Sequence, residues 1–126
     1  MMYRLSIKET FSAAHFLDGY RGACASMHGH NWDVEVFIVS DKLNQMGMVV
    51  DFKDLKRITK KILSELDHEL LNRVLPEGLN PTAENIAKYL FDKFKTAFAI
   101  QEKNNVLKVD KIRIFENRNS CCEYSG

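Results

Sequence analysis

The hydrophobic pattern changes its period twice along this chain, and that change limits the possible folds more than any other feature of the sequence. Apolar and polar residues alternate over 3–8 and 29–39, which indicates two half-buried strands. Apolar residues then recur every three or four positions over 52–66 and 83–98, which predicts two amphipathic helices. The alternation returns over 107–116, so a further strand follows the helices.

Capping and breaking residues support the limits of these elements. Asp51 and Thr82 stand where the N-caps of the two helices belong. Both prolines of the chain interrupt residues 72–81, which are therefore expected to form a connection. Residues 121–124 have the length of a short last strand. The order strand, strand, helix, helix, strand, strand favours an α+β fold, an antiparallel sheet with both helices on one face.

Length and charge exclude several classes of protein. The 126 residues make one domain, spanning 1–126, and 18 Lys and Arg against 17 Asp and Glu give a net charge of +1. This balance argues against a nucleic-acid or membrane-surface partner, which would normally require a basic stripe. No apolar run approaches the ~18 residues of a membrane span, and no signal-peptide layout opens the chain. Three cysteines, two of them adjacent, favour a reducing cytoplasm.

Histidines are concentrated in one part of the sequence. Three of the four, His15, His28 and His30, fall within sixteen residues. On an extended segment the rings of His28 and His30 project from the same face, and an antiparallel return from the first strand places His15 opposite them. Neutral imidazole is a preferred zinc ligand, so the spacing predicts a three-histidine zinc site with one open position. The alternative is that the three are unrelated, one packed and two solvated.

Cys24 stands four residues before His28 and has three interpretations. It is a fourth zinc ligand, a small buried apolar residue, or a thiolate base beside the metal. The polar and small residues around it disfavour the buried interpretation. Spacing does not separate a ligand from a base.

Asp67 and His68 are adjacent, as in proton-transfer pairs in which a carboxylate orients an imidazole, although a solvated helix end gives the same sequence. Glu116 ends the strand over 107–116, where most glutamates are solvated. The adjacent pair Cys121 and Cys122 has no metal partner at a useful spacing, so we interpret it as structural or incidental.

These residues belong to longer motifs that occur in order along the chain. The motifs are Phe11-Ser12-Ala13-Ala14-His15, Cys24-Ala25-Ser26-Met27-His28-Gly29-His30-Asn31, Gly47-Met48-Val49-Val50-Asp51-Phe52, Leu66-Asp67-His68-Glu69-Leu70-Leu71-Asn72, Pro81-Thr82-Ala83-Glu84-Asn85 and Glu116. From residue 11 to 124 the chain resembles the 6-pyruvoyltetrahydropterin synthase family. The Cys-x-x-x-His-Gly-His spacing together with Leu-Asp-His is the most specific part of the resemblance.

The resemblance implies the tunnelling fold, in which a four-stranded antiparallel sheet carries two helices. It implies homo-oligomers, in which trimers close their sheets into a barrel and two trimers stack as a hexamer. Barrel closure would remove exposed sheet edges. The resemblance also implies that the Asp-His pair of one chain reaches the metal of a neighbouring chain.

The resemblance also implies a role for each site residue. Zn²⁺ binds to His15, His28 and His30, while Cys24 stays off the metal as the base. Asp67 and His68 transfer the next proton. Glu116 anchors the pterin ring and Thr82 lines the same pocket.

Within the family, the Cys-x-x-x-His-Gly-His spacing resembles the bacterial 6-carboxytetrahydropterin synthases of queuosine and deazapurine biosynthesis. Those enzymes convert 7,8-dihydroneopterin triphosphate to 6-carboxy-5,6,7,8-tetrahydropterin and release acetaldehyde and triphosphate. The alternatives are a 6-pyruvoyltetrahydropterin synthase, which eliminates triphosphate only, and a non-catalytic zinc-binding member. A third branch, which makes a folate precursor, carries Glu near the cysteine, whereas here positions 24 and 25 are Cys and Ala.

Overall fold

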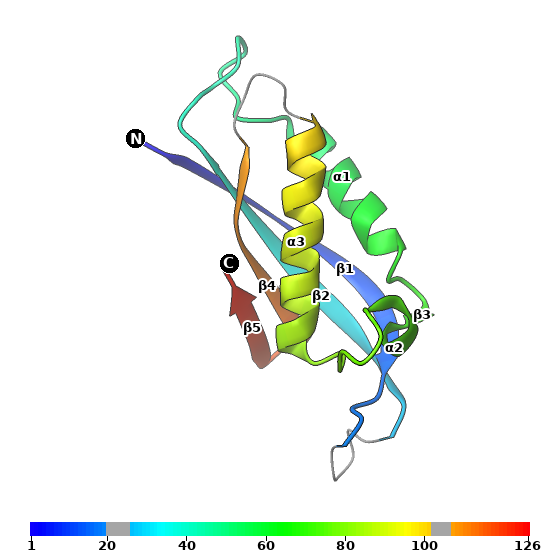
Figure 1. Cartoon of the computed structure of the whole chain (residues 1–126). Helices are drawn as coiled ribbons and strands as arrows, with labels where there is room; N and C mark the ends of the chain where they lie inside the picture. Colours follow the sequence, from blue (N-terminus) through cyan, green and yellow to red (C-terminus); the bar gives the residue numbers. More distant parts are fainter. Residues whose placement is uncertain (20–25, 102–106) are drawn as a thin grey trace.

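A five-stranded sheet with helices on one face forms the domain (Figure 1). The computed structural model describes residues 1–19, 26–101 and 107–126. Four strands form antiparallel pairs in the spatial order β1-β2-β4-β5, and they are β1 (Tyr3–His15), β2 (His28–Ser40), β4 (Lys108–Asn117) and β5 (Ser120–Tyr124). The expected alternating segments, including the short last strand, are therefore confirmed.

Two long helices cover the sheet on the same side, α1 (Phe52–Ser64) and α3 (Ala83–Gln101). Both begin where their caps predict. The Asp51 carboxylate accepts a hydrogen bond from the Lys53 amide at 2.8 Å, and the Thr82 hydroxyl accepts one from the Asn85 amide at 3.2 Å. The core lies between the helices and the sheet, and its largest fully buried side chains are Trp32, Phe11, Phe94, Phe98, Ile38, Leu55, Leu66, Leu71, Ile86, Leu90, Ile112 and Ile114.

The expected count of four strands and two helices is wrong in one region. Residues 69–74 form a two-residue strand, β3 (Glu69–Leu70), and a one-turn helix, α2 (Leu71–Val74). β3 pairs with β1 in parallel, opposite Ala13 and Ala14, and forms one edge of the sheet. Two strand residues and one helical turn are too short to show a hydrophobic period, so the pattern could not predict them.

The β1–β2 hairpin is much longer than the alternation over 3–8 suggested, because β1 runs to His15. Its register pairs Tyr3 with Ser40 at one end and His15 with His28 at the other, and places Ala13 opposite His30. Successive residues of a strand point to opposite faces, so all three histidines lie on the helix-covered face. The small residues over 12–14 weaken the alternation there, which hid the end of the strand from the sequence pattern.

The face without helices carries a row of alternating charges. Lys8 lies opposite Glu35, Glu35 opposite Arg113, and Arg113 opposite Glu123, so the row crosses β1, β2, β4 and β5. Its tightest ion pair joins Arg113 Nε to Glu123 Oε1 at 2.8 Å. No helix in the described ranges is both long and apolar enough to cross a membrane.

Candidate functional site

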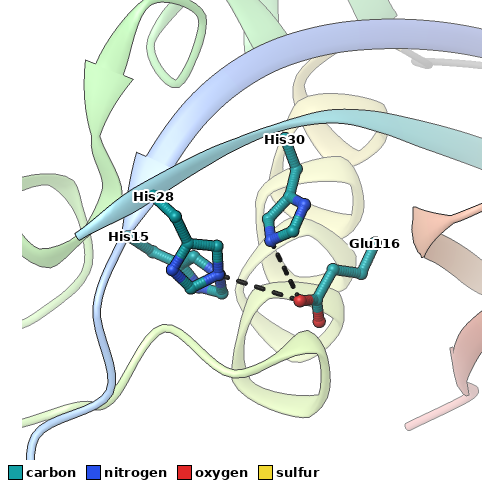
Figure 2. A group of neighbouring side chains, drawn as sticks. All are labelled: His15, His28, His30 and Glu116. Carbon is teal, nitrogen blue, oxygen red and sulfur yellow. Dashed lines mark hydrogen bonds and ion pairs between the residues drawn. The ribbon is translucent and has the colours of Figure 1, made fainter. Parts of the chain in front are cut away.

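Three histidines and one glutamate converge at the end of the β1–β2 hairpin (Figure 2). His15 comes from β1, His28 and His30 come from β2, and Glu116 comes from the end of β4. One nitrogen of each ring and one oxygen of the carboxylate all lie within 4.8 Å of one another. The predicted grouping of His15, His28 and His30 is therefore confirmed as geometry, and Glu116 joins it.

Backbone carbonyls hold two of the imidazoles in the tautomer that suits a metal. The Nδ1–H group of His15 donates to the Pro81 carbonyl, and that of His28 donates to the Ser26 carbonyl, each at 2.8 Å. A carbonyl oxygen can only accept, so each neutral ring carries its lone pair on Nε2. These two Nε2 atoms lie 3.1 Å apart. Two lone pairs at this distance repel each other, so the arrangement favours a cation between them.

His30 completes the set with a nitrogen that has no hydrogen-bond partner. Its Nε2 atom is buried, and no group in the described part of the chain pairs with it in hydrogen-bond geometry. The Glu116 Oε1 atom is 3.0 Å away, close enough for an ion pair. Burial lowers the pKa of His30, and His28 and His15 act in the same direction against the opposing effect of Glu116. A neutral, unpartnered imidazole is the form that binds a metal, so the donor set fits zinc.

Trp32 forms the floor of this site. It is fully buried two residues beyond His30, and its ring lies edge-on to His15 and His30 with centroids 5.0 and 5.3 Å away. Its indole N–H donates to the Ala13 carbonyl at 3.3 Å. A rigid apolar floor fixes the rings and lowers the local polarity, which strengthens electrostatic interactions at the site.

Two asparagines hold the chain directly after His15, and the sequence pattern indicates no role for either of them. The Asn72 amide accepts from the Phe16 N–H and donates to its carbonyl, at 3.0 and 2.9 Å. Asn80 makes the same pair of bonds with Asp18, both at 2.9 Å. These contacts link distant segments to the end of β1. Asn72 ends the motif that begins at Leu66, and Asn80 directly precedes the motif that begins at Pro81, but a motif alone does not identify a positioning residue.

Asp67 and His68 form the predicted pair at the sheet edge. The Asp67 carboxylate lies 2.9 Å from His68 Nδ1, and its other oxygen accepts from the Ser12 amide at 2.8 Å. The hydrogen bond from Ser12 lowers the pKa of Asp67, and His68 lowers it further. His68 adopts a left-handed conformation with φ of 61°, and its amide donates to the Ser12 carbonyl at 2.6 Å. Its side chain is 82% exposed and does not belong to the histidine cluster.

Two cavities lie beside these groups. One, of about 520 Å³, is bounded by Glu116, the start of α3 at Ala83 and Glu84, and β5. The other, of about 500 Å³, lies at the β3 edge and includes Ser12, Asn31 and His68. The first cavity is of a size that suits a small ring system. Glu116 thus borders both the histidine cluster and a cavity.

The remaining predicted residues stand as follows. Cys24 lies outside the described residues. Thr82 caps α3 one residue before Ala83 enters the cavity lining. Cys121 and Cys122 are free thiols on β5, and both line the cavity beside Glu116. Burial raises the pKa of both thiols.

Comparison with known proteins places this fold and site in a family. The profile of 6-pyruvoyl tetrahydropterin synthase matches residues 4–126, nearly the whole chain. This chain belongs to the 6-pyruvoyl tetrahydropterin synthase family. A relative from Archaeoglobus fulgidus is 40% identical over 119 residues, which cover 94% of this chain and 92% of that protein. The 6-carboxy-5,6,7,8-tetrahydropterin synthase of Haemophilus influenzae is 32% identical, covering 98% of this chain and 99% of its own length.

The solved structures agree. The 6-pyruvoyl tetrahydropterin synthase of Caenorhabditis elegans has a TM-score of 0.85 at 26% identity, covering 100% of this chain and 96% of that one. The resemblance inferred from the motifs and the tunnelling fold are therefore confirmed. As a member of the 6-pyruvoyl tetrahydropterin synthase family, this chain is a pterin-forming lyase.

Proposed function

We propose that this chain is a zinc-dependent 6-carboxy-5,6,7,8-tetrahydropterin synthase acting on 7,8-dihydroneopterin triphosphate. The observation that carries the proposal is the convergence of three imidazole nitrogens, two of them fixed as lone-pair donors by backbone carbonyls. The product assignment rests on the name of the relative from Haemophilus influenzae and on the Cys-x-x-x-His-Gly-His spacing. The products are the carboxypterin, acetaldehyde and triphosphate.

His15, His28 and His30 would hold the zinc. When bound, the metal supplies Lewis acidity toward the hydroxyl groups of the substrate side chain. The Trp32 floor and the carbonyl partners of His15 and His28 keep the rings in place, so binding requires little reorganisation.

The proton-transfer roles fall to three residues. The Cys24 thiolate removes a proton from the substrate side chain, and His68 accepts or delivers the next one. Asp67 keeps His68 oriented because the carboxylate binds His68 Nδ1, which leaves Nε2 free for the transfer. Glu116 binds the amino and ring N–H groups of the pterin, and Thr82 lines the same pocket.

The active site would be shared between chains of a hexamer built from two trimers. Two observations support this assembly: His68 is 82% exposed, and it lies at a sheet edge apart from the histidine cluster. A neighbouring chain that pairs with a free edge would bring its own Asp67 and His68 to the metal. The proposal places this assembly in the cytoplasm, within queuosine or deazapurine biosynthesis.

Product analysis tests the proposed reaction. Zinc-loaded protein is incubated with 7,8-dihydroneopterin triphosphate, pterins are identified by mass spectrometry, and acetaldehyde is measured in parallel. We expect carboxytetrahydropterin and acetaldehyde in equal amounts. Pyruvoyltetrahydropterin without acetaldehyde would assign the chain to the triphosphate-eliminating branch, and no turnover would favour a non-catalytic member.

Cys24→Ala separates a base from a ligand in the same assay. We expect this variant to keep zinc and lose activity, because three imidazoles already hold the metal. A variant that loses zinc would instead assign Cys24 to the metal.

A further inference from the structure

Glu116 occupies a position that a pterin anchor does not explain. Its Oε1 atom lies 3.0 Å from His30 Nε2 and 3.9 Å from His15 Nε2, while its side chain is 27% exposed. Figure 2 shows one carboxylate oxygen directed at the imidazoles and the other directed away from them. The Glu116 carboxylate therefore lies closer to the histidine cluster than binding of a pterin ring alone would require.

The backbone of β4 directs the Glu116 side chain toward the histidine cluster. Alternation along β4 buries Ile112 and Ile114 on the helix-covered face, and it sends Glu116 to the same face. The β4–β5 register shifts between Phe115 and Asn117, so Glu116 is the extra residue at this irregularity. Such irregularities redirect a side chain and are frequent beside functional sites. The backbone therefore aims Glu116 at the three rings.

Charge makes the contact unfavourable unless a cation is present. His15 and His28 donate through Nδ1 to carbonyls, so their Nε2 lone pairs face the cluster. A carboxylate beside inward-facing lone pairs is repelled, whereas a carboxylate beside a divalent cation is attracted. Three neutral imidazoles leave the full charge of such an ion uncompensated, and one carboxylate would neutralise half of it.

From this geometry we propose that Glu116 is the fourth protein ligand of the metal in the substrate-free enzyme and releases it when a pterin enters the neighbouring cavity. This rests on the proposed function for the metal and the substrate class. The cavity of about 520 Å³ borders Glu116, so one side-chain movement exchanges the metal for the pterin N–H groups. The open metal position that the substrate needs is then created by the arrival of the substrate itself.

Metal binding in the absence of substrate tests whether Glu116 is a metal ligand. Zinc affinity is measured by chelator competition for the wild type, Glu116→Ala and the matched control Glu84→Gln, whose carboxylate lines the same cavity outside the cluster. We expect Glu116→Ala to bind zinc about tenfold more weakly or worse, since losing even an outer partner costs about 10–100-fold, and Glu84→Gln to match the wild type. Cobalt(II) replaces zinc as a spectroscopic probe, and its visible absorption should differ between Glu116→Ala and the wild type.

The release of the metal by Glu116 is tested by adding unsubstituted pterin, which lacks the reacting side chain, to the cobalt-loaded proteins. The wild-type spectrum should move toward that of Glu116→Ala, while the spectrum of the variant should stay nearly constant. Equal zinc affinities and spectra for the wild type and Glu116→Ala would overturn the inference. Zinc binding that is weakened in Cys24→Ala but unchanged in Glu116→Ala would overturn it as well. A wild type that binds neither metal would overturn the proposed metal centre as well, so the two failures are distinguishable.

Discussion

The two groups of chemically active side chains differ in how complete they are within one chain. The histidine cluster draws residues from three strands, lies on the buried face of the sheet, and has its rings fixed by Pro81, Ser26 and Trp32. The Asp67–His68 pair is equally well oriented, by its bonds to Ser12, but His68 projects from the sheet edge and is 82% exposed. In the proposed function the first group would need only a metal, whereas the second would act at the cluster of a neighbouring chain.

This difference separates two kinds of preorganisation. Burial lowers the pKa of His30, and backbone carbonyls hold the Nδ1–H groups of His15 and His28, so the Nε2 atoms of these two rings face the cluster as lone-pair donors. The exposed pair keeps a carboxylate of lowered pKa beside an imidazole, the arrangement that the proposed proton transfer requires. Substitutions in the two groups should therefore affect different measurements.

The largest effect is expected for His28→Ala. Removing a direct ligand should weaken zinc binding by more than about a hundredfold, beyond the usual cost of losing an outer partner, and abolish activity with it. Chelator competition and metal analysis measure the loss. A variant that retains a full equivalent of tightly bound zinc would refute the three-histidine assignment.

A smaller effect, confined to catalysis, is expected for His68→Ala. Loss of a positioned proton-transfer group should lower kcat by about 10²–10⁴-fold while zinc content stays unchanged. The neighbouring Glu69→Gln, also exposed, serves as the control and should keep its activity. If His68→Ala loses zinc in parallel with activity, the two groups are not independent.

The smallest effect concerns acid stability at Asp67. Its pKa is lower in the folded protein than in the unfolded chain, so its contribution is present above about pH 4 and is lost as the pH falls through the folded value. Asp67→Asn should therefore lose less stability than the wild type between about pH 5 and about pH 3. Urea unfolding at each pH measures this, with the exposed Asp41→Asn as control. Identical pH profiles for the wild type and Asp67→Asn would show that the Ser12 and His68 contacts do not stabilise the carboxylate.

The fold could be predicted wherever the chain repeats a period for long enough. The helices α1 and α3 and the strands β2 and β4 follow from their apolar patterns and caps. The segment of Glu69 to Val74 could not be predicted, because β3 and α2 depend on contacts with β1 rather than on a local pattern. The alternation marks only residues 3–8 of β1, since the small residues before His15 take their extended form from pairing with β2, but the placement of His15 at the end of this strand is confirmed.

The histidines of the site could be predicted from the sequence, but the groups that hold them in place could not. The spacing of His28 and His30 and the antiparallel return to His15 suffice for the cluster. The Pro81 carbonyl and the two asparagine contacts come from segments more than fifty residues away, so no local pattern indicates them. The direction of Glu116 depends on the register shift in β4, which only the structure shows.

Mixing inactive variants tests most directly whether the two groups meet between chains. His28→Ala and His68→Ala are combined in equal amounts, dissociated and reassociated, and assayed after zinc loading. Because one site in four would combine an intact cluster with an intact His68, random assembly should recover up to about a quarter of wild-type activity. Activity that stays at background although mixed oligomers have formed would place both groups of each active site in one chain and contradict this account.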